Sequence, residues 1–349
     1  MHLSPTMSIR NWFALSGVAL LCLCSAYPAQ AEWIYREQSI MGTRCAVELW
    51  SEDRERAEQA IESVFADMRR IDALMSTWKS DTQLAEVNRL AAQQPVVVSQ
   101  ELFDLLGVAL EYSRETAGAF DITYASVGYL YDFRQHVHPD PQQIRAALPG
   151  INFRYVVLDP ATRSIRYTRA GTRIDLGGIA KGHAVDRGIE LLRQAGFTRA
   201  MVNSGGDTRI IGDRFGKPWI VGVRDPDKES VSFLRIPLTD AAISTSGDYE
   251  RYFDEGGQRF HHIIDPATGD SARKVRSATV IGATALRTDA LSTSVFVLGP
   301  ERGLELVERL KDVDAVIVTP AGKVLYSSGL APPEAGADRS TTGQSKPTN

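Results

Sequence analysis

Cysteine is scarce in this sequence. Its 349 residues include three cysteines, and two of them, Cys22 and Cys24, lie in an N-terminal apolar run. Removal of that run on export would leave Cys45 alone, so no disulfide could form within the chain. No cysteine and histidine cluster has the spacing of a zinc site. We therefore expect the hydrophobic core to supply the stability, with Cys45 buried in it as a small apolar side chain.

The chain also lacks any run of lysine and arginine, and its formal net charge is −4. Nucleic acid and anionic membrane surfaces are therefore not natural partners. Two nucleotide-binding fingerprints are missing as well: the G-x-G-x-x-G of dinucleotide-binding folds and the Gly-Lys-Ser/Thr of Walker sequences. Because the chain is net acidic, the negative charge of a phosphate-rich ligand would have to be compensated locally by backbone amides, a cation or both.

No apolar run is long enough to span a membrane comfortably. The run from Trp12 to Cys24 follows Arg10 and precedes Ala29-Gln30-Ala31, which has the small-x-small pattern of a cleavage signal. We predict that residues 1–31 are a signal peptide and that the protein is exported to the periplasm. Anchoring as a lipoprotein is the less favoured alternative, because leucine precedes each leader cysteine where a lipidation motif takes a small residue.

The remaining chain has the composition of an ordinary globular protein, 43% apolar and 23% charged. Apolar residues recur at helical spacing in residues 53–75 and 283–298. Residues 81–116 are predicted to be mostly helical with a break at Gln94-Pro95, and alternation predicts a hairpin over residues 155–170. Residues 331–349 are rich in proline, glycine, serine and threonine, so we expect a disordered tail.

One glycine turn organises the sequence. Ile174 to Leu176 has the alternation of a short strand, Gly177-Gly178 follows, and a helix starts near Gly178 with Lys181 in its first turn. Loose amides and the positive dipole end of a helix suit a phosphate, and Asp175 lies at the mouth of the turn. A lone Gly-Gly is also common in ordinary turns, so by itself this candidate phosphate site has low specificity.

Asp289 and Thr293 lie four residues apart on the predicted helix 283–298 and therefore share a face. A carboxylate and a hydroxyl together are hard oxygen ligands that suit Mg²⁺. A buried aspartate satisfied by the threonine hydroxyl is an equally good interpretation.

Four other residues are each open to two interpretations. Trp78 follows a predicted helix end and could stack on a ring, although alone it is more often a lid on the core. Asp121 could accept a hydrogen bond from a ligand, although capping of the next segment is favoured. Gly42 could mark a bend that meets a ligand or a strand bulge. His262 lies beside two apolar residues, which alone favours a structural role.

Several short motifs, in one order from residue 41 to about 298, resemble the ApbE family of FAD:protein FMN transferases. Each is weak alone, whereas the ordered set is highly specific. They are Met41-Gly42-Thr43, Ser76-Thr77-Trp78, Gly118-Ala119-Phe120-Asp121, Asp175-Leu176-Gly177-Gly178-Ile179-Ala180-Lys181-Gly182, Asn203-Ser204-Gly205-Gly206-Asp207, Ser244-Thr245-Ser246-Gly247-Asp248-Tyr249, His262-Ile263-Ile264-Asp265-Pro266-Ala267-Thr268-Gly269, and Thr288-Asp289-Ala290 with Thr293.

The resemblance implies a fold and a set of site residues. It implies an α+β fold with mixed and antiparallel sheets and packed helices, T-fold-like in architecture, forming one catalytic unit over residues 32–330. Mg²⁺ would be held by the carbonyl of Gly178, Asp289 and Thr293, and His262 matches a histidine implicated in the transfer step. The residues implied to contact FAD are Met41, Trp78, Ala119, Phe120, Asp121, Asp175, Lys181 and Ile264.

The resemblance also implies an activity: transfer of FMN from FAD to a threonine or serine hydroxyl of an acceptor protein, with release of AMP. The acceptor would be a redox protein, membrane-bound or exported. Two alternatives stay open, an FAD pyrophosphatase that gives FMN and AMP, and an exported flavin-binding protein without catalysis.

Overall fold

The computed structural model describes residues 31–226 and 228–330. The predicted tail and all but the last residue of the predicted signal peptide lie outside these ranges. No helix within them is both long and apolar enough to cross a membrane.

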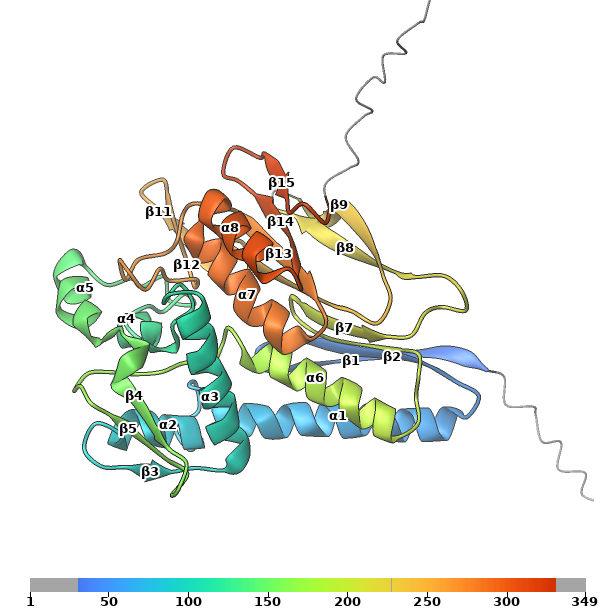
Figure 1. Cartoon of the computed structure of the whole chain (residues 1–349), viewed down its shortest axis with the longest axis horizontal. Coiled ribbons are helices and arrows are strands. Elements are labelled where there is room, and N and C mark those ends of the chain that lie inside the picture. Colours follow the sequence, from blue (N-terminus) through green and yellow to red (C-terminus); the bar gives the residue numbers. More distant parts are fainter. Residues whose placement is uncertain (1–30, 227, 331–349) are drawn as a thin grey trace, which may run out of the picture.

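An eight-stranded sheet forms the body of the molecule (Figure 1), in the order β1-β2-β6-β7-β10-β13-β14-β15. Every neighbouring pair in it is antiparallel. The predicted α+β class is therefore confirmed. The strands are β1 (Glu32–Ile40), β2 (Thr43–Ser51), β6 (Ala200–Ser204), β7 (Asp207–Ile211), β10 (Ala242–Gly247), β13 (Ser277–Gly282), β14 (Asp314–Val318) and β15 (Val324–Tyr326).

Four helices pack in a layer with this sheet. They are α1 (Arg54–Met75), α6 (Ala180–Gln194), α7 (Ala285–Leu298) and α8 (Pro300–Leu310). α6 packs between α1 and α7, and α7 packs on β10 and β13 (Figure 1). Most residues of α7 are buried. A polar side chain on α7 is therefore held among fixed neighbours rather than in solvent.

Smaller elements surround this body. The predicted hairpin of residues 155–170 is present as two strands of a three-stranded sheet, β3-β5-β4, and two further two-stranded sheets are β8-β9 and β11-β12. The elements are α2 (Gln83–Leu90), β3 (Val96–Val97), α3 (Gln100–Glu115), η1 (Ile122–Tyr124), α4 (Ala125–Gly128), α5 (Pro141–Ala147), η2 (Leu148–Gly150), η3 (Phe153–Tyr155), β4 (Val156–Asp159), β5 (Ser164–Tyr167), β8 (Trp219–Asp225), β9 (Lys228–Leu238), β11 (Tyr252–Glu255) and β12 (Gln258–His261).

The predicted strand from Ile174 to Leu176 is absent, whereas the predicted helix is present and begins at Ala180, close to Gly178. The segment is held by a side chain instead of a neighbouring strand. The Asn88 side-chain amide donates to the Ile174 carbonyl at 2.8 Å and accepts from the Ile174 N–H at 2.8 Å. Asn88 thus makes the two hydrogen bonds that a strand partner would make.

The crossing of α6 and α7 depends on Gly182. A Cβ atom built there would lie 2.4 Å from the carbonyl oxygen of Ala285 at the start of α7. No real Cβ contact is that short, and the obstacle is backbone, which cannot rotate away. The absence of a side chain at Gly182 therefore sets the approach of the two helices.

We expect Gly182→Ala to lower the free energy of unfolding by about 1–3 kcal/mol, the usual cost of overpacking. Urea unfolding at equilibrium measures it. Gly107→Ala in α3 is the matched control, because a Cβ there meets only Leu158 Cδ1 at 3.9 Å. That control should be neutral or stabilising, since alanine favours a helix more than glycine does. Equal stability of the two variants would contradict the packing argument.

Candidate active site

Lys181 joins two buried carboxylates. Its Nζ lies 2.7 Å from Asp207 Oδ2, at the start of β7, and 3.4 Å from Asp289 Oδ2 on α7. The two aspartates are 2% and 3% exposed, respectively. Burial opposes the charge of Lys181, but the two carboxylates outweigh it and raise its pKa. The ammonium therefore stays charged and holds β7, α6 and α7 together at one point.

Asp289 is held in an environment that disfavours its charge. Burial and the nearby charge of Asp207 raise its pKa to about 7, while Lys181 and the N–H of Gly182 act in the opposite direction. The Gly182 N–H donates to Asp289 Oδ2 at 3.0 Å. Two carboxylates and one ammonium carry a formal net charge of −1 here (−2 + 1). Additional positive charge would stabilise the cluster.

Thr293 lies beside the glycine turn. A Cβ on Gly178 would be 3.3 Å from Thr293 Oγ1 and 3.3 Å from a ring carbon of Phe120. Asp289 is bonded to Lys181 and Gly182 rather than to Thr293, so the interpretation of an aspartate satisfied by that hydroxyl is wrong. The structure thus brings Gly178, Asp289 and Thr293 into one neighbourhood, with Lys181 between Asp289 and the sheet.

The amides of the turn are less available than the sequence suggested. The Gly177 N–H donates to Asp175 Oδ1 at 2.7 Å, and the N–H groups of Ile179 and Ala180 donate to the Leu176 carbonyl at 3.0 and 2.8 Å. The expectation of a row of loose amides is wrong for these three residues. Charge compensation for an anion must come mainly from side chains or a cation.

Asp175 joins the turn to two other segments. It accepts hydrogen bonds from Thr77 Oγ1 at 2.6 Å and from the Tyr124 hydroxyl at 2.9 Å. Thr77 brings the neighbouring Trp78 to the turn, and Trp78 is 68% exposed with the Arg134 guanidinium 5.7 Å from its ring centroid. The core-lid interpretation of Trp78 is therefore wrong, because most of this side chain is exposed and its ring contacts a guanidinium rather than the core.

Asp121 is occupied by the chain itself. It caps η1, accepting from the N–H and hydroxyl of Thr123 at 2.8 and 2.5 Å and from the Phe153 N–H at 2.9 Å. The favoured capping interpretation agrees with this geometry. Phe120 beside it is buried, and Ala119 is half-buried against the cluster around α7 and α8.

The Met41-Gly42 pair forms the two-residue turn between β1 and β2, with φ of 55° and 69°. The strand-bulge interpretation of Gly42 is therefore wrong. A Cβ on Gly42 would lie 3.4 Å from Arg251 Nη2, so this turn approaches the start of β11. Ile264 lies outside this turn. It is buried in an apolar cluster that also contains Phe253 and the partly buried Tyr124.

His262 follows β12 and is half-buried, and its N–H donates to the Arg251 carbonyl at 3.1 Å. Its Nδ1 is shielded from solvent and has no hydrogen-bond partner among the described residues. Burial, then the charge of Arg251, lowers the pKa of His262 to about 3. The ring is therefore neutral near pH 7, and the unprotonated nitrogen of a neutral imidazole can accept a proton.

The two adjacent histidines should couple stability to pH. Burial lowers the pKa of His261 to about 4 and that of His262 to about 3, from an ordinary value of 6.5. Between pH 6.5 and 4 the unfolded chain binds protons that the folded chain does not, so the free energy of unfolding falls as the pH drops. We expect a lower urea midpoint at pH 5 than at pH 7.5, and a smaller difference in His261→Gln. An unchanged difference in that variant would contradict this assignment.

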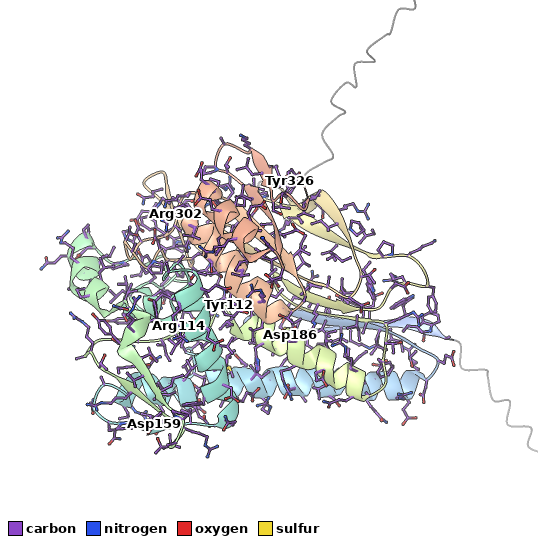
Figure 2. The ribbon with its side chains drawn as sticks, viewed as in Figure 1. Tyr112, Arg114, Asp159, Asp186, Arg302 and Tyr326 are labelled. Carbon is purple, nitrogen blue, oxygen red and sulfur yellow. The ribbon has the colours of Figure 1, made fainter. Side chains whose placement is uncertain are left out.

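The role of Asp186 was not predicted from the sequence. This α6 side chain accepts from the N–H groups of Ala285 and Leu286, each at 2.9 Å, and so caps α7 from another helix (Figure 2). Arg209 of β7 donates to the same carboxylate at 2.8 Å. Tyr124, a donor to Asp175, was missed as well. In both cases the partners are far apart in sequence, so no local pattern could reveal them.

Comparison with known proteins adds to this geometry. The model of the ApbE family matches residues 41–317. An FAD:protein FMN transferase of Treponema pallidum is 33% identical over 338 residues, covering 90% of this chain and 93% of that protein. One from Klebsiella pneumoniae is 32% identical over 293 residues, covering 83% and 90%.

Solved structures agree. The ApbE protein of Thermotoga maritima has a TM-score of 0.80 and 32% identity, covering 85% of this chain and 98% of that one. The flavin transferase ApbE of Vibrio cholerae has a TM-score of 0.76 and 28% identity, covering 86% and 98%. The family match extends over most of the chain and includes every residue of the candidate site. This chain therefore belongs to the ApbE family.

Proposed function

We propose that this chain is an FAD:protein FMN transferase, an enzyme that moves FMN from FAD to a threonine or serine hydroxyl of an acceptor protein and releases AMP. The observation that carries the proposal is the meeting of Lys181, Asp207 and Asp289 in one buried cluster, with Thr293 beside the Gly178 turn. The relatives from Treponema pallidum and Klebsiella pneumoniae are FAD:protein FMN transferases, which agrees with this proposal.

The cluster fits a divalent cation. Its formal charge of −1, with Asp289 buried and its pKa raised, favours a further positive charge. The described residues contain no group of three carboxylate, imidazole or thiolate side chains that could hold a metal. Asp289, the Thr293 hydroxyl and the Gly178 carbonyl, the ligands that the family resemblance implies, would hold Mg²⁺ together with substrate phosphate oxygens. When bound, Mg²⁺ supplies electrostatic stabilisation of the charge that develops on those oxygens.

The remaining chemistry belongs to the chain's own residues. A neutral His262 takes the proton of the acceptor hydroxyl. The acceptor oxygen then bonds to the phosphorus of the FMN part, the bond from that phosphorus to the bridging oxygen breaks, and AMP leaves with the electron pair. Burial is the main cause of the low pKa of His262, and the ammonium of Lys181 contributes to it.

Flavin binding is assigned to the surrounding residues. The exposed ring of Trp78 would stack on an aromatic ring of FAD. Met41, Ala119, Phe120, Asp175 and Ile264 are proposed to contact FAD along the rest of its length. Asp121 would act there indirectly, since its oxygens already accept hydrogen bonds from Thr123 and Phe153.

We also propose export to the periplasm, on the strength of the apolar run and cleavage signal before Glu32. An acceptor of this enzyme would then be an exported or membrane-bound redox protein.

Co-expression with candidate acceptors tests the proposal. After denaturing electrophoresis, an acceptor that carries covalent flavin fluoresces in the gel, whereas bound but unlinked flavin is lost. We expect a fluorescent acceptor band only when this chain is present, and no band when the target hydroxyl is replaced by alanine. Rapid production of free FMN and AMP with no labelled acceptor would indicate the pyrophosphatase instead.

A further inference from the structure

Arg251 lies directly beside His262. In the β11-β12 hairpin Tyr252 pairs with His261, so the next pair outward is Arg251 with His262. The His262 N–H donates to the Arg251 carbonyl at 3.1 Å. Directly opposite residues of an antiparallel pair project to the same side. The guanidinium and the imidazole therefore share one face at this end of the hairpin.

Nearby arginines are paired with carboxylates. Arg259 lies 3.1 Å from Asp254 and Arg273 lies 2.7 Å from Asp270. Within residues 31–226 and 228–330, by contrast, no carboxylate lies within ion-pair distance of Arg251. Its side chain is exposed, so the charge is available to a ligand.

The position of Arg251 relates it to the candidate site. Its Nη2 would be 3.4 Å from a Cβ on Gly42, so it lies against the Met41-Gly42 turn. Its charge also reaches Tyr124, the residue that donates to Asp175: burial and Asp175 raise the pKa of Tyr124 well above its ordinary value, and Arg251 opposes that rise. The guanidinium of Arg251, which has no carboxylate partner among the described residues, thus lies close to the β1-β2 turn, to His262 and to Tyr124, the donor to Asp175.

We propose that Arg251 is a phosphate-binding residue of this site. This proposal rests on the proposed function, because it supplies one of the charges that a bound diphosphate requires. The cluster of Lys181, Asp207 and Asp289 has no positive charge to spare, and most amides of the glycine turn are occupied. A guanidinium binds phosphate oxygens with two parallel hydrogen bonds, so it also fixes the orientation of the phosphorus toward His262.

Binding measurements with three flavins test this role. FAD and FMN carry phosphate, whereas riboflavin carries none, and each can be titrated by quenching of its fluorescence. We expect Arg251→Gln to lower the affinity for FAD and for FMN about tenfold and to change the affinity for riboflavin less than twofold. Arg251→Lys should recover part of the loss, because it restores the charge without the planar pair of donors.

Arg259→Gln is the matched control, since it removes the same charge from the same hairpin at a residue already paired with Asp254. It should change all three affinities less than twofold. Unchanged FAD binding in Arg251→Gln would overturn the proposal, as would equal weakening of riboflavin, which would indicate packing. Weaker use of the acceptor with unchanged FAD binding would also overturn it and assign Arg251 to the acceptor.

The outcomes for Arg251 and for the proposed function are separable. Binding of FAD that depends on Arg251, in a protein that labels no acceptor, would contradict only the transferase assignment. If the unaltered chain transfers FMN and Arg251→Gln binds FAD with unchanged affinity, only the role of Arg251 would be contradicted.

Discussion

Asp289→Asn should reduce flavin transfer at least about a thousandfold, a loss of roughly 4 kcal/mol of transition-state stabilisation. The substitution keeps the shape of the side chain and an oxygen that can accept from the Gly182 N–H. It removes the charge that Asp289 contributes beside Asp207 and Lys181, and with it the anionic ligand for a metal. The measurement is the initial rate of covalent flavin incorporation as a function of added Mg²⁺.

The fold should survive this change. Asp289 is buried, and its raised pKa shows that its charge is disfavoured there, so the neutral amide should not lower the thermal midpoint much. Asp312→Asn is a suitable control, because Asp312 pairs with Arg287 at the surface. Chelation of divalent cations should abolish transfer by the unaltered chain. Normal transfer by Asp289→Asn in metal-free buffer would refute the metal assignment.

His262→Gln should lower the turnover number about 10²–10⁴-fold, the usual contribution of a general base. The affinity for FAD should change only a few-fold, because His262 acts on the acceptor hydroxyl rather than as a main flavin contact. The low pKa of His262 also predicts that transfer shows no loss of rate near pH 6.5 from protonation of this residue. Single-turnover transfer and fluorescence titration separate chemistry from binding.

His138→Gln is the control for His262. His138 stacks on Phe260 and pairs with Glu255, and none of these three residues has a role in the proposed chemistry. It should transfer flavin at nearly the normal rate. If His262→Gln did so too, the base would have to be another group, and the shielded Nδ1 of His262 would need a different explanation.

Local sequence carried much information about the helices. Two of the predicted helical segments are present as α1 and α3, and the side chains of Asp53 and Ser99 cap them. The prediction of a strand from Ile174 to Leu176 was wrong. The apolar alternation is real, but the backbone of Ile174 is hydrogen-bonded by the Asn88 side chain and not by a neighbouring strand. Periodicity reports which side chains are buried. It does not report what satisfies the backbone.

The site was predictable as a set of motifs but not as a geometry. Asp289 contacts Lys181, which lies 108 residues away in the sequence. This long-range contact sets the net charge of the cluster. The resemblance singled out Lys181 and Asp289 separately and left Asp207 without a role. Only the fold, with α6 and α7 brought together at Gly182 and α7 capped by Asp186, shows why the three charges meet.

The ratio of AMP released to FMN linked tests the proposed transfer most directly. The purified chain is incubated with FAD, Mg²⁺ and an acceptor, and the AMP released is compared with the FMN found on the acceptor by mass spectrometry. Flavin transfer releases one AMP for each FMN linked to a threonine or serine of the acceptor, so we expect a ratio of one to one. Intact FAD, or AMP released while the acceptor keeps its original mass, would contradict it.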